Sequence, residues 1–351
     1  GILPVLHSDT EVLAALESDS AKIIAAPPSY PFLIALKAQQ HPVLVVTSSS
    51  RSAEDLAESL RDLHSRVYEF PAWETLPHER LSPRSDTVAQ RIATLYSLQL
   101  TDATHPVVVA PVRAVIHRFI ASLATEPLWT LEIGQEIGLT ELITHLTELA
   151  FTRTDLVEKR GEFAVRGGIV DVFLPLAMHP VRIDFFGDEI EELRYFEVAD
   201  QRTSEAVIGK LSILPCREFL LSDEICARAE KLKSQYPGAL EIIGKIADGI
   251  TVDGMESLIP LLINDFTTIA QRMPAQTEIL FIDGERIRSR TADLIETNEE
   301  FLEASWSNAA IGASAPLPVE KVTYLSWEAL HEELTTLELR IGALNPFGSD
   351  L

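Results

Sequence analysis

The chain has 351 residues, 46% of them hydrophobic, which predicts two or three domains with ordinary apolar cores. Its net charge of −24 disfavours duplex DNA as the main partner, because a DNA-binding protein needs clustered Lys and Arg, and it favours basic protein partners. The sequence contains no run of 18 apolar residues and no signal peptide, so no membrane segment is predicted. The two cysteines, Cys216 and Cys226, lack the spacing of a zinc site and fit a reducing compartment. The sequence therefore predicts a cytoplasmic protein without a metal or a cofactor.

Strands and helices alternate along the first hundred residues. A helix is predicted to start at residues 8–11, where polar capping residues precede an apolar series. Residues 42–47 and 106–110 are continuous apolar runs, typical of buried parallel strands. The other elements predicted here are helices at 32–40, 53–63 and 87–98 and a strand at 67–70. This alternation predicts βαβ units and a doubly wound parallel sheet.

Residues 151–203, preceded by a predicted helix at 139–149, have a different pattern. Short runs rich in Val, Ile, Phe and Tyr are separated by turn residues such as Gly161 and the pairs at 167–168 and 187–188. This pattern predicts an antiparallel meander. Because its flanks have α/β character, we expect an inserted module, and such modules often bind partners.

Side chains alternate between two faces along residues 181–186. One face, expected in the core, takes Val181, Ile183 and Phe185, and the other takes Arg182, Asp184 and Phe186. An aromatic residue beside an arginine on a polar face is typical of a protein-binding hot spot. Alternatively, another element covers this face, so that Phe186 is core and Arg182 pairs with Asp184 or Asp171.

From about residue 209 the α/β character returns. The predicted elements are helices at 227–235, 257–262, 285–306 and 327–339, a strand at 278–282 and a short strand at 323–325. Residues 308–319, with Gly, Ser and Pro, are the best linker candidate. No final element is recognisable after residue 339, and we expect the chain to be a fragment of a longer protein.

The first strand-to-turn unit lies where a nucleotide-binding fold has its phosphate loop. A P-loop needs G-x-x-x-x-G-K-[ST], because backbone N–H groups and the Lys hold the phosphates. Residues 25–32, AAPPSYPF, contain no Gly and no Lys, and three prolines remove N–H donors. The sequence therefore predicts that this segment binds no nucleotide.

Three blocks carry a family resemblance. RGEFAVRGGIVDVF at 160–173, HPVRIDFFGDEIEELRYF at 179–196 and ADQRT at 199–203 resemble the second domain of the bacterial transcription-repair coupling factors, the Mfd family, and a similar module occurs in the excision-repair protein UvrB. Residues 73–83 with 91–98 resemble the first domain of that family. Residues 253–262 and 299–306 resemble the return half of that domain, in its actinobacterial form.

The resemblance implies a fold class and a domain order. The fold is expected to be α/β, with a P-loop-NTPase-like parallel-sheet domain that is degenerate, lacks a Walker A motif and is split by a β-rich insertion like UvrB domain 2. Its parts are the first half of the α/β domain at 1–128, the insertion at 129–210, the return half at 211–307, and a linker with a C-terminal helix at 308–351.

The resemblance also implies a function. It predicts a non-catalytic adaptor that recruits UvrA to stalled RNA polymerase in transcription-coupled excision repair, with Arg166, Arg182 and Phe186 matching the positions that contact UvrA. In the longer protein, later domains would mask this face, and other parts would bind RNA polymerase and DNA and hydrolyse ATP.

Two other functions compete with this one. The chain could be an ATP-dependent, UvrB-like processor of damaged DNA, which residues 25–32 disfavour, or a duplex-DNA-binding module, which the net charge disfavours. The acidic groups at 191–192 and 299–303 are interpreted as solvated faces, and His78 as part of a loop ordered by Trp73 and its prolines.

Overall fold

The computed structural model describes residues 22–76, 79–236, 239–310 and 324–347. The helix start predicted at residues 8–11 and His78 lie outside these ranges. The chain forms two compact units. The first takes residues up to 72, 94–121 and from 265 onward, and the second takes residues 73–93 and 122–264. The two units are defined by contacts within the chain. The domain boundaries predicted from the sequence remain a proposal.

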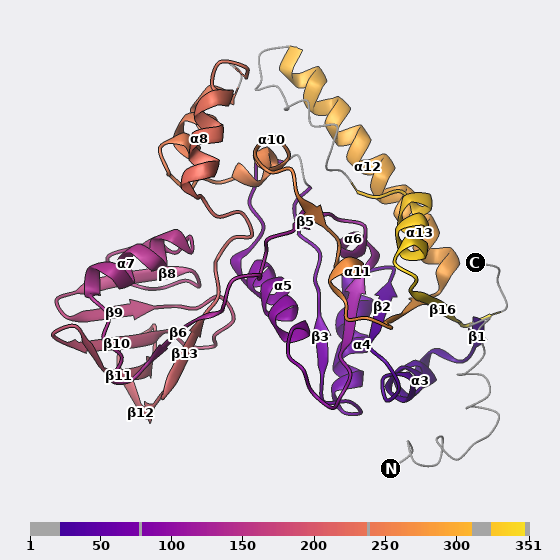
Figure 1. The fold of residues 1–351 in the computed structure, drawn as a ribbon, viewed down its shortest axis with the longest axis horizontal. Helices are drawn as coiled ribbons and strands as arrows, with labels where there is room; N and C mark the ends of the chain where they lie inside the picture. Colours follow the sequence, from indigo (N-terminus) through magenta and orange to yellow (C-terminus); the bar gives the residue numbers. More distant parts are fainter. Residues whose placement is uncertain (1–21, 77–78, 237–238, 311–323, 348–351) are drawn as a thin grey trace. The chain divides into compact units, whose positions relative to one another are not determined.

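The first unit is built on a six-stranded parallel sheet (Figure 1). Its strand order is β1 (Lys22–Ile24), β16 (Arg340–Asn345), β15 (Glu278–Ile282), β2 (Val43–Thr47), β4 (Val107–Pro111) and β3 (Val67–Glu69). Every residue of β2 and β4 is buried, as their unbroken apolar sequences predict. The predicted parallel sheet is confirmed.

Helices of this unit pack on the sheet and on one another. They are α3 (Tyr30–Lys37), α4 (Ser50–Arg61), α6 (Val112–Val115), α11 (Ile269–Arg272), α12 (Gly284–Ala310) and α13 (Trp327–Thr336); α5 (Ser85–Leu98) contributes residues to both units, and β5 (Phe119–Ile120) pairs with β14 (Phe266–Thr267). Helix α4 shows why its sequence folds this way. The Ser49 hydroxyl caps it by accepting the N–H of Ser52 at 3.2 Å, and Ala53, Ala57 and Leu60 form its buried face.

The C-terminal part of the chain differs from the prediction. The terminal helix is confirmed as α13, but the strand β16 that follows it was not predicted. The proposed short strand at 323–325 is wrong for its described residues, since Tyr324 and Leu325 are irregular. The first three residues of the linker predicted at 308–319 belong to α12, and most of the rest lies outside the described ranges.

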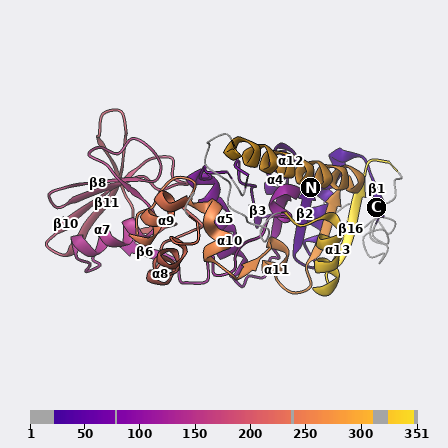
Figure 2. The same cartoon turned by 90° about the horizontal axis from the view of Figure 1, so that it is seen from above.

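The second unit contains a six-stranded sheet, here called the meander sheet. Its order is β12 (Thr203–Val207), β11 (Glu189–Phe196), β10 (Val181–Phe186), β9 (Ile169–Val172), β8 (Glu162–Arg166) and β7 (Thr152–Arg153). All neighbours run antiparallel except β7 and β8, which confirms the predicted meander. Helix α7 (Leu139–Glu148) lies along one face of the sheet in both views (Figure 1, Figure 2). Its Leu142 and Leu146 belong to the same core as Val181 and Ile183.

The remaining elements of this unit are short. They are the strand pair β6 (Trp129–Glu132) and β13 (Lys210–Ile213), the helices α8 (Asp223–Leu232), α9 (Leu240–Ala247) and α10 (Ile259–Leu262), and the 3-10 turn η3 (Met255–Leu258). A buried ion pair of Arg91 with Glu218 helps to hold them, and Glu218 also accepts the indole N–H of Trp73 at 3.0 Å.

Candidate functional site

The three residues predicted to bind a partner lie on two strands of the meander sheet. Arg166 ends β8, directly before the two-residue turn at Gly167 and Gly168, and Gly167 has φ +64°. Glycine adopts such a conformation without steric cost, so this turn brings β9 back beside β8 in a fixed register. In the next pair, Asp171 of β9 lies directly opposite Arg182 of β10.

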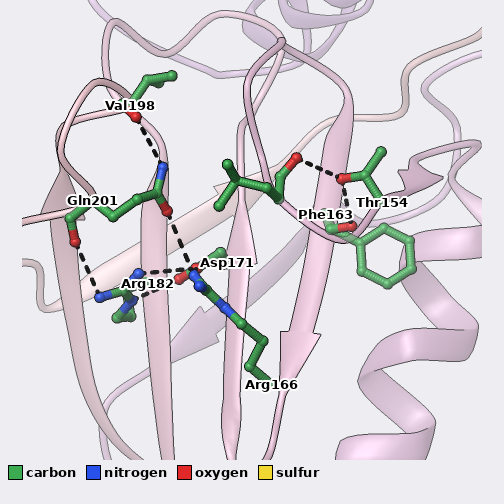
Figure 3. A network of polar contacts seen from close by, with 8 residues as sticks. Thr154, Phe163, Arg166, Asp171, Arg182, Val198 and Gln201 are labelled. Atoms are coloured by element: carbon green, nitrogen blue, oxygen red, sulfur yellow. Dashed lines mark hydrogen bonds and ion pairs between the residues drawn. The ribbon is translucent and has the colours of Figure 1, made fainter.

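Asp171 joins the two arginines (Figure 3). Its side chain is 1% exposed, and its two carboxylate oxygens accept Nε and Nη2 of Arg182 at 2.7 and 2.9 Å. Arg166 donates Nη2 to one of the same oxygens. This bidentate geometry fixes the guanidinium plane of Arg182, and the hydrogen bonds that Arg182 donates to Asp171 raise the pKa of Arg182 above its ordinary value.

Gln201 closes the network from the turn between β11 and β12 (Figure 3). Its backbone has φ +62°, and its carbonyl oxygen accepts Nη1 of Arg182 at 3.4 Å. Its side-chain Oε1 accepts Nη2 of Arg166 at 3.5 Å, and its Nε2 donates to the carbonyl of Val198 at 2.9 Å. The guanidinium of Arg182 also lies over the Phe196 ring, 4.9 Å from its centroid, which adds a cation–π contact.

The arginines keep donors for a partner. A guanidinium carries five N–H groups. Arg182 uses three, and the Nε and Nη1 groups of Arg166 donate to no other residue in the described part of the chain. The Arg166 side chain is 47% exposed and that of Arg182 is 17% exposed. The structure therefore brings these two predicted residues together as a held pair with free hydrogen-bonding edges.

Phe186 lies apart from this pair, at the far end of β10. It shares a face with Arg182 and Asp184, as the alternation predicts, and it is 77% exposed. The alternative prediction, in which Phe186 is core, is therefore wrong, whereas the proposed pairing of Arg182 with Asp171 is confirmed. Val181 and Ile183 are fully buried, and Phe185 packs against the same core.

Asp184 lies between Arg182 and Phe186 on this face. No hydrogen bond or ion pair joins its carboxylate to another described residue, and burial raises its pKa despite the nearby charge of Arg182. A half-buried carboxylate without a direct partner can accept a hydrogen bond from an incoming donor. We define the candidate surface as Arg166, Arg182 and Phe186, with Asp184 between them.

The sequence alone did not identify the supporting residues. Asp171 entered only as one of two possible ion-pair partners, and Gln201 was not singled out. One signal was present, because an aspartate inside the apolar strand IVDV is expected to be paired when buried.

The segment predicted from the sequence to bind no nucleotide lies in the first unit. Residues 27–29 form a 3-10 turn that leads directly into α3. Pro27, Pro28 and Pro31 have no N–H group, Ser29 donates its N–H to the carbonyl of Ala26 at 2.9 Å, and Tyr30 donates to Pro27. All the N–H groups of residues 27–31 are thus missing or already bonded, so this loop offers a phosphate no backbone donor.

The chain is similar to a known domain family and to several longer proteins. A match to the family described as "UvrB interaction domain" covers residues 129–219, which include the meander sheet. The transcription-repair-coupling factor of Mycobacterium tuberculosis is 45% identical over 320 residues, 85% of this chain and 26% of that protein. The factors of Myxococcus xanthus and Escherichia coli are 30% and 28% identical, over 72% and 86% of this chain and 23% and 26% of theirs.

The chain fits the N-terminal module of a transcription-repair-coupling factor. It spans about a quarter of the length of the curated relatives that it matches. No helix in the described ranges is long and apolar enough to cross a membrane. Within the same ranges, no group of three or more His, Cys, Asp or Glu residues is placed to hold a metal ion.

Proposed function

We propose that the module is a non-catalytic adaptor that binds UvrA and recruits it to stalled RNA polymerase for transcription-coupled excision repair. The observation that carries this proposal is the exposed Phe186 on the same face as the fixed arginine pair, inside the region that matches the UvrB interaction domain. In the longer relatives, contacts with RNA polymerase and DNA and ATP-driven movement would belong to other parts of the protein.

The chemistry of the surface supports a protein partner. Arg182 and Arg166 present planar donors suited to carboxylates, and Phe186 offers a ring that gains free energy when it leaves water. Arginine and aromatic side chains dominate measured hot spots of protein interfaces. The partner surface is therefore expected to combine carboxylates with an apolar recess for the Phe186 ring.

The adaptor proposal includes the predicted domain order and the absence of catalysis. The α/β domain would consist of residues 1–128 and 211–307, the UvrA-binding insertion of 129–210, and the end of the chain of 308–351. The donor-free loop at residues 27–31 supports a module that binds no nucleotide.

Binding of purified UvrA to the 351-residue chain tests the proposal. Replacing Arg182 or Phe186 by Ala is expected to weaken binding by about 2 kcal/mol or more, which is about thirtyfold in Kd. The measurement is surface plasmon resonance with immobilised module. Circular dichroism must show that both variants remain folded.

Matched controls come from the same unit. Met178 is 84% exposed and lies on the connection from β9 to β10, and the Arg202 side chain is 84% exposed and pairs with Asp200. Ala variants of these two residues are expected to bind UvrA like the wild type. If Arg182→Ala and Phe186→Ala also bind like the wild type, the assigned surface is wrong.

A further inference from the structure

The register of the meander sheet places Asp184 in a row of four residues that crosses the sheet. Ile169 of β9 lies opposite Arg166 of β8 on one side and opposite Asp184 of β10 on the other. Asp184 in turn lies opposite Glu192 of β11. Side chains directly opposite each other in an antiparallel pair have Cβ atoms about 4.5–5.5 Å apart, and like charges at such positions destabilise the sheet. Asp184 therefore faces a second carboxylate on the neighbouring strand.

The charges around Asp184 are already paired with one another. In the adjacent row, Asp171 holds Arg182, and Arg182 lies opposite Arg194 of β11. Arg194 donates Nη2 to the carboxylate of Glu192. This hydrogen bond lowers the pKa of Glu192, so that this carboxylate is ionised at neutral pH. Within these two rows of described residues, Asp184 is the charged side chain that no hydrogen bond or ion pair reaches.

Asp184 is half-buried, but its carboxylate can be reached from solvent. Neither of its oxygens is enclosed, whereas Nε of Arg194 on the next strand is enclosed and has no partner. Burial raises the pKa of Asp184, the charge of Arg182 opposes this shift, and the charges of Glu192 and Asp171 add to it. A carboxyl group whose pKa is raised by folding lowers the stability of the fold while it is ionised. The ionised Asp184 is therefore unfavourable in the free module and would be stabilised by a cation.

A basic side chain of a partner would supply this cation. A hydrogen bond between two charged groups is stronger than one between neutral groups, above all where the site is partly withdrawn from water. The Phe186 ring follows Asp184 on the same face of β10 and is 77% exposed. The aliphatic stem of a Lys or Arg side chain can pack on such a ring while its charged end reaches the carboxylate. Asp184 and Phe186 together therefore suit a long basic side chain.

Asp184 also limits which acidic surfaces the two arginines can accept. Arg166 and Arg182 alone would attract any cluster of carboxylates. A partner carboxylate that meets Asp184 instead of an arginine is repelled, and such an unfavourable contact separates the correct partner from other acidic proteins. The mixed pattern of charges is therefore more selective than the arginine pair alone.

We propose that Asp184 determines the specificity of the candidate surface by binding a Lys or Arg side chain of UvrA. This inference rests on the proposed function and adds a charge pattern to it. The contacting surface of UvrA would carry carboxylates opposite Arg166 and Arg182, and beside them a basic side chain opposite Asp184. Arg194 is a positioning residue at the edge of this pattern, because it holds the Glu192 carboxylate and keeps it from competing for the same cation.

Surface plasmon resonance with UvrA and the complete chain tests the inference at physiological salt. Asp184→Asn keeps the shape and removes the charge, and it is expected to weaken binding about tenfold. Asp184→Lys should weaken binding about a hundredfold, because the basic side chain of UvrA would then meet a like charge. Asp184→Glu keeps the charge and should bind about threefold more tightly than Asp184→Asn. Asp155→Asn and Asp155→Lys, at an exposed position outside the candidate surface, are the matched controls and should bind like the wild type.

Urea unfolding separates this role from a structural one. Because Asp184→Asn removes an unpartnered carboxylate that faces Glu192, its urea midpoint should equal or exceed that of the wild type. Weaker binding together with unchanged or higher stability is the expected combination. Weaker binding with a clearly lower midpoint would assign Asp184 to the stability of the fold and would overturn the inference.

The inference is also overturned if Asp184→Asn binds UvrA like the wild type or more tightly, or if Asp184→Glu binds no better than Asp184→Asn. In either case the adaptor function stands as long as Arg182→Ala and Phe186→Ala weaken binding. If the wild-type chain binds no UvrA, both proposals are wrong.

Discussion

Asp171 is expected to affect partner binding through the two arginines that it holds. Its carboxylate is almost fully buried and holds both arginines. Asp171→Asn keeps the shape but removes the charge and one acceptor, so two guanidinium groups would lie close together without a counter-charge. We expect UvrA binding to fall about as far as in Arg182→Ala, and the free energy of unfolding to fall by about 1–3 kcal/mol.

The measurement has two parts that separate positioning from stability. Surface plasmon resonance at 10 °C gives the affinity of a folded variant, and urea unfolding gives the stability. Asp155→Asn is the comparison, since Asp155 is exposed in the same unit, lies outside the candidate surface and holds neither arginine by a hydrogen bond. A folded Asp171→Asn module that binds UvrA with wild-type affinity would show that the arginines need no buried carboxylate.

Gly254 illustrates a second kind of residue effect, set by space and backbone. It has φ +75°, and an added Cβ would lie 2.3 Å from the carbonyl carbon of Arg80 and 2.5 Å from its Cα. Because both conflicts involve backbone, Gly254→Ala is expected to lower the free energy of unfolding by about 3 kcal/mol or more. Gly209→Ala is the control, since nothing lies within 4 Å of its added Cβ. Urea unfolding of the two variants should differ clearly, and equal stabilities would contradict this explanation.

At the scale of elements, a buried charge cluster joins α3 to β15. The Lys37 ammonium donates to both oxygens of Glu278 at 2.7 and 2.9 Å, and Nε2 of His41 lies 2.6 Å from the same carboxylate. Burial, with the charges of Arg340 and Lys37, lowers the pKa of His41 to about 4. The ring is therefore neutral at pH 7, and in the tautomer with a proton on Nε2 it donates to Glu278.

This shift predicts how stability depends on pH. Between pH 6.5 and 4 the unfolded chain binds a proton at His41 that the folded chain does not bind, so the free energy of unfolding falls as the pH falls. The contribution of His41 is about 2 kcal/mol between pH 7 and 5. In urea unfolding, His41→Gln should lose stability less steeply than the wild type over this interval. Parallel pH profiles would show that His41 does not titrate in this way.

The strands also show how far the sequence could be interpreted. Residues 42–47, 106–110 and 278–282 were predictable because their long apolar runs report burial on both faces. Strand β16 was not, because the sequence RIGALN has a weak pattern and its burial comes from pairing with β1 and β15. Tertiary pairing, which no local pattern encodes, decided this element.

The same limit applies to the candidate site. Alternation placed Arg182 and Phe186 on one face, but it could not tell whether another element covers that face. The partner of Arg182 was also left open, since the register of β9 and β10 depends on the connection at 173–180 and not on a two-residue turn. Gln201 contacts both arginines from a separate turn, so its contribution is visible only in three dimensions.

At the scale of the whole molecule, the parallel sheet connects distant parts of the sequence. Among the strands of the described ranges, β1 at residues 22–24 pairs only with β16 at residues 340–345, and the complete second unit lies between them in the sequence. During synthesis on the ribosome, β1 therefore waits for its neighbour until almost all of these residues have left the exit tunnel. The meander sheet, whose strands are close in sequence, can assemble earlier, so the candidate surface is expected to form while the parallel sheet is still incomplete.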